Sequence, residues 1–587
     1  MNAVISAFTA LFVSGAVFTR LSGKTSFQDK TVFSSVSDWK YAALFLTVFA
    51  ALFVSSVFID ADRIRRAALL FSYAAYAAVC MTLTDDAFFC LGACVILLPI
   101  SVFACHGSPK GKDMNKYALV AVCAAAGIYF AVLFSLQTVC RYLSLSTPCF
   151  DFGIFSQMFY NMKKTGIPYT SCEREGILSH FAVHVSPVYY LFLPFYCIFP
   201  SPLTLQICQA VTLASGVIPA CLLCRRVGLS RKAAAVFVLL YALYPALGGG
   251  TYYDVHENKF LAPLLLWMFY FLESDKILPS AVFAASVCLV KEDAPVYVVF
   301  AGIYYLIAKK SRRQRIAAVC FSVFAAVYFL GVTYCLARFG DGVMNYRYSN
   351  FMAEGQSSLF SVVANVFKAP AYAVYEIFSV DGAKPDVSKL EFMLQTVVPL
   401  GALPFLIKNY DRLILLCPFV LVNLMPDYVY QHDIFFQYTY GAFPFLFLAA
   451  VLNYRDLRPE TKRTVAMFAL VSSVLFCTQT VWRRATYLNT YLEGKNGYDE
   501  VRQTLESIPE DASVSATSFF CAALSGRSEL YSLNNSKNEH RTDYICIDMR
   551  WRAYSKYFDK YKDDAEYEKV YEREGLAVIL KKTEKAE

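Results

Sequence analysis

Charged residues are scarce in this sequence. Only 17% of its 587 residues are Asp, Glu, Lys or Arg, against about 25% in an average soluble domain. Hydrophobic residues make up 57% of the chain, and the mean hydropathy is +0.43. This excludes an ordinary soluble protein and predicts a polytopic, all-α membrane protein in contact with the lipid bilayer. The net charge of +8 predicts no nucleic-acid partner, because the basic residues occupy short loops between apolar runs and act there as orientation signals.

Several motifs are also missing. The chain has no internal repeat, no low-complexity tract and, in its C-terminal part, no glycine-rich phosphate loop. The absence of repeated halves argues against a transporter of the inverted-repeat type. Most of the 19 cysteines lie inside apolar segments, where they are typical small, polarisable helix residues. We therefore expect neither a disulfide framework nor a cysteine metal site.

Long apolar runs dominate what is present. A spanning helix needs about 20 apolar residues, and we expect about 13–15 such helices. The first, Met1–Thr19, lacks a basic start and a cleavage site and is expected to be retained. The long runs are 2–19, 41–59, 67–84, 87–105, 117–139, 203–224, 233–250, 316–336, 392–407 and 464–481, and the shorter ones are 258–272, 277–290, 294–308, 413–426 and 437–453.

The distribution of Lys and Arg predicts the orientation of these helices. All the basic clusters can face the cytoplasm together if the N-terminus is also cytoplasmic. The connections Asp85–Asp86, 251–257, 291–293 and 427–436 then face outward, and only one of them carries a Lys. The basic clusters are Arg63/Arg65/Arg66, Lys110/Lys112/Lys116, Arg225/Arg226/Arg231/Lys232, Lys309/Lys310/Arg312/Arg313/Arg315 and Arg455/Arg458/Lys462/Arg463.

One apolar segment, Pro187–Phe199, would invert the later orientation if it crossed the membrane. It is short and contains Pro194, so we expect an interfacial or re-entrant helix instead. Two long outer loops follow from this choice, at 140–202 and 337–391. Within the second, the amphipathic stretch Leu359–Phe378 is either a juxtamembrane helix or a surface loop.

The composition changes near residue 483. A polar helix is expected over 498–508, followed by short strands at 512–517, 543–548 and 575–581. Strands alternating with helices predict a small α/β domain, here extracytoplasmic. The expected domains are therefore 1–115 (N-terminal transmembrane helices), 116–482 (transmembrane core) and 483–587.

Titratable residues gather in the outer connections. Four of the six histidines lie there together with several carboxylates. Ionisable groups at a membrane boundary are costly to desolvate and mark a functional site when they converge. The residues are His180, His184, His256, His432, Asp151, Asp254, Glu257, Glu292, Asp293 and Asp433.

Two of these positions have competing interpretations. Asp151, in CFDFGIFSQ, could act as a general base for an acceptor hydroxyl or cap a helix over 154–163. In TYYDVHE, Asp254, His256 and Glu257 could converge on one ligand or form the polar end of the helix over 258–272. We favour a functional site in TYYDVHE, because three ionisable groups exceed what capping requires.

The remaining positions are also open. His180 and His184 share a helix face, which suits either a metal or a hydrogen-bonded structural pair, but Phe181 rules out an HExxH motif. Lys291 could bind a phosphate as a point charge or neutralise its acidic neighbours. His432 belongs to the weaker motif QHD.

The order of these motifs resembles a known family. DFGIFSQ, then HFAVH with SP, then Gln206 and Gln209, then YYDVHE and KED is similar to the DUF2079 family of bacterial membrane proteins over about residues 115–460. That family is itself similar to the GT-C glycosyltransferase superfamily. The resemblance implies a GT-C-like fold with a large first outer loop, in a multi-pass protein of the bacterial cell membrane.

The resemblance also implies residue roles. Asp151, Asp254 and His256 would be catalytic. Asp254 and Glu257 could hold a divalent cation, Mg or Mn, although the first outer loop has no DxD motif; no other cofactor is expected. The implied substrate-binding residues are Gln157, His180, His184, Glu257, Lys291, Glu292 and His432.

The expected function is transfer of a sugar from a polyprenyl-phosphate donor to a cell-envelope glycan, lipid or protein on the outer face. Asp151 would take the acceptor's proton, and Lys291 with His256 or a metal would stabilise the departing phosphate. Two other classes stay open: a lipid or sugar transporter or flippase, and a non-catalytic membrane scaffold that presents the C-terminal domain.

Overall fold

The computed structural model describes residues 2–21, 37–58, 61–107, 111–174, 176–309, 311–342, 344–379, 388–534 and 539–583. Lys110, Lys310 and residues 380–387 of the predicted second outer loop lie outside this part. The chain forms two compact units. The first unit comprises 1–126, 217–249 and 347–484, and the second comprises 127–216, 250–346 and 485–587.

The described part of the chain contains nine helices that are long and apolar enough to cross a membrane, with further apolar helices of 10–17 residues. Each long one coincides with a run predicted from hydropathy, because a continuous apolar run satisfies its backbone hydrogen bonds internally only as a helix. The prediction of a polytopic helical membrane protein is confirmed.

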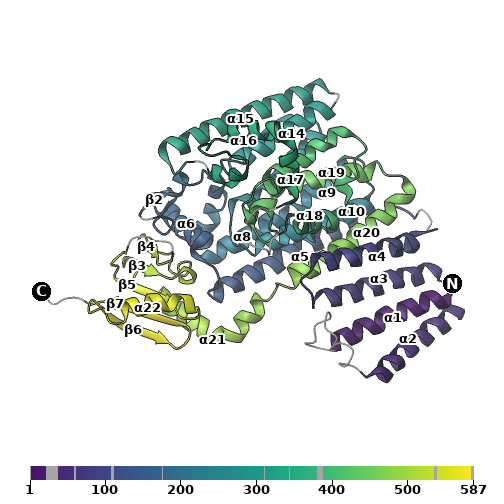
Figure 1. Ribbon diagram of the computed structural model, residues 1–587, viewed down its shortest axis with the longest axis horizontal. Helices are drawn as coiled ribbons and strands as arrows, with labels where there is room; N and C mark the ends of the chain where they lie inside the picture. Colours follow the sequence, from purple (N-terminus) through teal and green to yellow (C-terminus); the bar gives the residue numbers. More distant parts are fainter. Residues whose placement is uncertain are drawn as a thin grey trace. The chain divides into compact units, whose positions relative to one another are not determined.

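The first unit begins with a row of packed helices. Of the first four, drawn in purple and blue in Figure 1, α1 packs against both α2 and α3, α3 packs against α4, and α20 packs against α3 and α4. Buried residues of these last three helices, among them Tyr73, Leu97 and Phe476, form one apolar core. The helices of this unit are α1 (Asn2–Leu21), α2 (Asp38–Phe58), α3 (Asp62–Met81), α4 (Ala87–Cys105), α9 (Val217–Arg226), α10 (Arg231–Ala242), α16 (Leu359–Lys368), α17 (Pro370–Phe378), α18 (Lys389–Val397), α19 (Phe443–Arg455) and α20 (Pro459–Cys477).

Two predicted spans do not form single helices. The run 413–426 is divided between a 3-10 helix, Tyr410–Leu416, and a π-helix, Phe419–Leu424. The run 392–407 does not form a long helix: α18 ends at Val397 and is followed by two 3-10 turns, Val398–Leu400 and Leu403–Phe405. Gly401 and Ala402, between the two turns, have positive φ angles of 67° and 54°. The second residue of each turn is a proline. Proline removes a backbone donor and a positive φ cannot continue a right-handed helix. Hydropathy alone did not reveal the break.

The amphipathic stretch Leu359–Phe378 forms the helices α16 and α17. Val362 and Ala373 are buried, whereas Phe360 and Phe367 are 80% and 82% exposed. Of the two predicted alternatives, a helix rather than an irregular loop is therefore the structure of this segment.

The second unit holds the remaining helices. Helices α14 and α15 pack along each other, and α12 packs against α13. The segment Pro187–Phe199 forms only a 3-10 turn, Pro187–Leu191, and the short helix α7, which is the predicted outcome for a segment too short to span. The helices are α6 (Ile154–Thr165), α7 (Leu193–Ile198), α8 (Pro202–Ser215), α12 (Leu261–Glu273), α13 (Ile277–Cys288), α14 (Pro295–Ala308), α15 (Arg312–Phe339), α21 (Tyr487–Glu506) and α22 (Ser555–Tyr561); α5 (Lys116–Leu143) and α11 (Pro245–Thr251) run from one unit into the other.

A five-stranded mixed sheet lies at the C-terminus, shown in yellow in Figure 1. The strand order is β4-β3-β5-β7-β6, with β3 parallel to β4 and β5, and β7 antiparallel to β5 and β6. Tyr561 of α22 packs on Ile545 and Ile547 of the sheet. The α/β prediction is confirmed, although strands β4 and β6 were not predicted. The strands are β3 (Val514–Ala516), β4 (Leu530–Ser532), β5 (Tyr544–Asp548), β6 (Tyr567–Arg573) and β7 (Ala577–Lys582), and a two-stranded sheet pairs β1 (Tyr169–Thr170) with β2 (Leu178–Ser179).

Candidate active site

Most of the predicted site residues meet in the second unit. They come from the loop after α5, the turn after β2, the connection between α11 and α12, and the turn between α13 and α14. Apart from the turn after β2, these connections follow or precede an apolar helix, so the helices place polar side chains at their ends. Asp151, His184, His256, Glu257 and Lys291 thereby belong to one cluster of ion pairs.

Asp254 is a fully buried carboxylate, with 0% exposure. Its Oδ2 lies 2.6 Å from a guanidinium nitrogen of Arg141, and its Oδ1 accepts a hydrogen bond of 2.9 Å from Gln206. Its backbone φ is +87°, a conformation that costs a non-glycine residue about 1–3 kcal/mol and collects at functional sites. Partners on both of its oxygens therefore fix the position of this carboxylate.

A buried lysine lies beside Asp254. Lys259 donates to the backbone carbonyl of Asp254 and to the side-chain oxygen of Gln209, and it is 3.4 Å from the carbonyl of Thr251. Its amine is thus hydrogen-bonded within the protein, as a buried polar group requires. Gln206 and Gln209, which carried part of the family resemblance, connect Asp254 with Lys259.

Glu257 forms a second ion pair, with Lys291 at 2.9 Å. The hydroxyl of Tyr189 donates to the Glu257 carboxylate at 2.6 Å and accepts from the Glu257 backbone N–H at 2.9 Å. Burial alone would raise the pKa of Glu257, but the Lys291 ammonium and the hydrogen bond from Tyr189 hold that pKa well below its ordinary value. Glu257 is therefore ionised, and it fixes Lys291.

His256 lies between the two acidic groups of the site. Its Nδ1 accepts a hydrogen bond of 3.3 Å from the backbone N–H of Asn258 and so caps the turn Glu257–Phe260. Burial lowers the pKa of His256 well below its ordinary value, which makes the ring neutral with its proton on Nε2. That Nε2 lies 3.9 Å from Oδ2 of Asp151. The predicted capping role and the predicted site role therefore coexist.

Asp151 is the accessible member of the cluster. Its side chain is 21% exposed, whereas those of Asp254 and Glu257 are 0% exposed. Burial, followed by repulsion from Glu257, raises its pKa to about 6. The alternative that Asp151 caps a helix is wrong, because Gly153 is the N-cap residue of α6 and no side chain caps that end.

His180 and His184 each face a carboxylate. Nδ1 of His180 is 3.0 Å from Glu173, and Nδ1 of His184 is 2.8 Å from Glu292. Burial alone would lower the pKa of His180, but Glu173 raises it above its ordinary value. Glu292 also accepts from the backbone N–H of Val185 at 3.1 Å. Of the two predicted alternatives, this is the geometry of a hydrogen-bonded structural pair.

Gln157 was predicted to bind substrate, but its side chain is hydrogen-bonded within the protein. Its side chain is fully buried; its Nε2 donates to the carbonyls of Arg527 and Ser528 and to the hydroxyl of Ser171, and its Oε1 accepts from Thr170 and from the N–H of Ser171. These bonds occupy both ends of the amide. Gln157 instead fastens the loop that carries Asp151 to the C-terminal domain.

The predicted divalent-metal ligands, Asp254 and Glu257, each pair with a protein cation. Within the described ranges, no group of three or more His, Cys, Asp or Glu side chains is arranged to hold a metal ion. In this structure these two carboxylates do not form a metal site, and the mechanism proposed below does not involve a metal. Dependence on Mg or Mn stays a prediction.

His432 lies in the first unit. It lines a cavity of about 190 Å³ with Glu391, Asp433 and Gln479. Burial lowers the pKa of His432 to about 4, and within the part of the chain that the structure describes neither ring nitrogen has a hydrogen-bond partner. Its substrate contact stays a prediction.

Three important residues were not predicted: Arg141, Tyr189 and Lys259. Arg141 ends an apolar helix and resembles an ordinary orientation signal. Tyr189 is one aromatic residue among many. Lys259 was the detectable one, because an ionisable residue at the start of an apolar run is itself a sign of function.

Comparisons with known proteins give one strong match. Residues 141–578 match the family described as "Predicted membrane protein (DUF2079)". No curated protein matches. Among solved structures, ArnT from Cupriavidus metallidurans bound to undecaprenyl phosphate has a TM-score of 0.46 at 9% identity, covering 80% of this chain and 98% of that one. Arabinofuranosyltransferase AftD from mycobacteria has a TM-score of 0.42 at 11% identity, covering 81% of this chain and 40% of that one. Because the family match extends over more than half of the sequence, the chain belongs to the DUF2079 family of predicted membrane proteins.

Proposed function

We propose that this protein is a membrane-embedded glycosyltransferase that moves a sugar from a polyprenyl-phosphate donor to a cell-envelope acceptor on the outer face. The observation that carries the proposal is Asp151, a partly exposed carboxylate at the edge of a buried ionic cluster, with a pKa raised to about 6. A general base works best when its pKa lies near the working pH, and such a perturbed group beside fixed charges is typical of an active site.

Asp151 acts on the acceptor hydroxyl. It takes the hydroxyl proton while the acceptor oxygen bonds to the anomeric carbon of the donor, and the bond from that carbon to the phosphate oxygen breaks. The electron pair of the broken bond stays on the lipid phosphate. A single displacement of this kind inverts the sugar carbon.

The rest of the cluster supplies the electrostatic environment. Arg141 and Lys291 bring fixed positive charge into a region from which water is largely excluded, and Nε2–H of His256 is a neutral donor beside Asp151. Preorganised donors and cations stabilise charge that develops on a leaving phosphate. Because each cation already has a carboxylate or carbonyl partner, their positions are set before substrate binds.

The test uses the substitution Asp151→Asn in purified, full-length protein. The amide keeps the shape of the side chain but cannot take a proton, so transfer of a radiolabelled sugar should fall about 10²–10⁴-fold while the polyprenyl-phosphate sugar still binds. Asp563→Asn, an exposed position in the C-terminal domain, is the matched control. Undiminished transfer by Asp151→Asn would eliminate Asp151 as the base. Sugar accumulating inside vesicles without covalent transfer would favour a transporter.

A further inference from the structure

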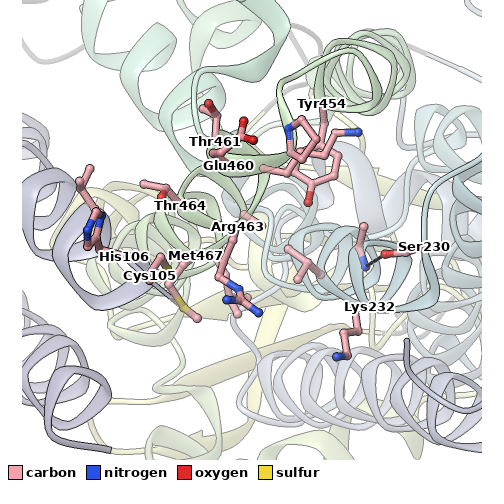
Figure 2. Close-up of a pocket in the computed structure, with 18 residues that line it drawn as sticks. Cys105, His106, Ser230, Lys232, Tyr454, Glu460, Thr461, Arg463, Thr464 and Met467 are labelled. Carbon is pink, nitrogen blue, oxygen red and sulfur yellow. Dashed lines mark hydrogen bonds between the residues drawn. The ribbon is translucent and has the colours of Figure 1, made fainter. Parts of the chain in front are cut away.

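The first unit contains a large cavity remote in sequence from all the site residues above. Its volume is about 930 Å³, near the upper end of the range of about 300–1,000 Å³ for small-molecule sites. It is lined by the end of α4, the start of α10 and the start of α20 (Figure 2). Lys and Arg distribution predicts that these helix ends face the cytoplasm.

One end of the cavity is basic. Lys232 from α10 and Lys462 and Arg463 from α20 line it, together with His106 after α4, and Figure 2 shows Lys232, Arg463 and His106 among the side chains that line the cavity. Glu460 is the acidic residue of the lining. Basic side chains therefore outnumber acidic ones where the cavity reaches the helix ends.

The basic side chains, rather than the α10 backbone, are what the cavity offers an anion. The first N–H groups of α10 are already bonded, because Asp113 accepts from those of Arg231 and Lys232 at 3.0 and 3.1 Å and Ser230 accepts from that of Ala233. Helix α20 begins at Pro459 without a side-chain cap, and it places Lys462 and Arg463 in its first turns, where the helix dipole also favours a negative charge.

The other end of the cavity is apolar. Val102 of α4, Val236 of α10, and Ala466, Met467 and Leu470 of α20 line it. Along α20, Leu470 lies about 10 Å beyond Arg463 at 1.5 Å per residue. Polarity therefore changes in the same direction along each of the three helices, from charged at the end to apolar within.

From this gradient we propose that the cavity binds one anionic phospholipid, with its phosphate on Lys232, Lys462 and Arg463 and an acyl chain along the apolar wall. A basic pocket between membrane helices is suited to a lipid headgroup, and a free phosphate would leave the apolar half of the cavity unfilled. The site is distinct from the proposed active site and does not depend on the proposed function.

The experiment is native mass spectrometry of the full-length protein in a neutral detergent. We expect one phosphatidylglycerol to be retained in preference to phosphatidylcholine, and millimolar inorganic phosphate not to displace it. The double variant Lys232→Gln with Arg463→Gln should weaken retention about thirtyfold, from about 1 kcal/mol for each cation near a lipid surface. Arg63→Gln with Lys276→Gln, two exposed basic residues outside the cavity, should retain the lipid fully.

Two further variants separate binding from misfolding. Lys232→Arg with Arg463→Lys keeps both charges and should retain the lipid, whereas Ala466→Leu fills the apolar wall and should lose it without removing charge. Equal retention by the double Gln variant and its control would overturn the proposal, as would equal retention of phosphatidylcholine. Displacement by inorganic phosphate would assign the cavity to a free anion instead and would also overturn it.

Discussion

Oδ2 of Asp151 and Nε2 of His256 lie 3.9 Å apart, although the two residues belong to separate connections of the chain. This places a titratable, partly exposed carboxylate beside a neutral imidazole, with the ion pair of Glu257 and Lys291 directly behind. From this arrangement we predict the effects of substitution and pH on the transfer rate and on stability, and the effect of chelation on the transfer rate.

The transfer rate should depend on the ionisation of Asp151. A base acts only when deprotonated, and the pKa of Asp151 is raised to about 6. The rate should therefore fall as the pH drops below about 6 and level off above it. The measurement is kcat/KM for sugar transfer between pH 5 and 8. A profile flat through pH 6 would contradict the assignment.

The raised pKa of Asp151 affects stability in the opposite direction to the rate: stability falls as the pH rises. In the unfolded chain Asp151 has a pKa of 3.8, and in the folded protein it has one of about 6. Between these values the folded state binds more protons, so the contribution of Asp151 to stability falls as the pH rises through that window. At pH 7, Asp151→Asn should therefore melt at or slightly above the temperature of the unsubstituted protein, while Asp563→Asn should leave it unchanged. A markedly lower melting temperature for Asp151→Asn would indicate a structural role.

The pair of Arg141 and Asp254 should show strong coupling. Removing one partner of a buried pair leaves an uncompensated charge and costs about 3–5 kcal/mol. Arg141→Met and Asp254→Asn should each destabilise the protein, and the double variant should lose less than the sum of the two. The melting temperature of each variant in detergent measures these losses of stability. The exposed pair Lys562 and Asp559 is the control, and its removal should leave the melting temperature unchanged. Additive losses at Arg141 and Asp254 would rule out the coupling.

Gln157 should matter for stability more than for substrate binding. Gln157→Ala removes the donor to the buried carbonyl of Arg527 and the acceptor of the buried Thr170 hydroxyl, at about 2–4 kcal/mol. The melting temperature should drop and kcat should fall with little change in KM. Gln503→Ala, on the exposed side of α21, should change neither. A rise in KM alone would restore the predicted substrate contact.

Chelation tests the predicted divalent cation. Because Arg141 and Lys291 already face Asp254 and Glu257, we expect transfer to persist in EDTA. The check is the same transfer assay with and without EDTA, followed by addition of Mg or Mn. Activity lost on chelation and restored by either ion would establish the metal site that the sequence suggested.

Much of the membrane fold could be predicted from the sequence, since long apolar runs have few alternatives to a helix. The failure at 392–407 arose where Pro399 and Gly401 break a run whose hydropathy is uniform. Strand β4 was missed because Leu530–Ser532 is short and its parallel pairing with β3 depends on distant residues. Local patterns do not contain that information.

The site was predictable only in part. Carboxylates and imidazoles stand out in an apolar sequence, so Asp151, Asp254 and His256 could be found. Their partners could not, because Arg141 resembles a flanking charge and Tyr189 resembles a core aromatic. His432 was grouped with them by its expected side of the membrane, whereas it lies in the other compact unit.

The hydrogen bonds between Gln157 and the C-terminal domain limit where the protein can be truncated. The family match continues to residue 578, inside β7, well past the last long apolar helix. A truncation at residue 484 would strip the backbone around Asp151 of the carbonyls and hydroxyls that anchor it. The C-terminal segment therefore helps to hold the loop that carries Asp151, and we expect the helices expressed alone to lose the position of that loop.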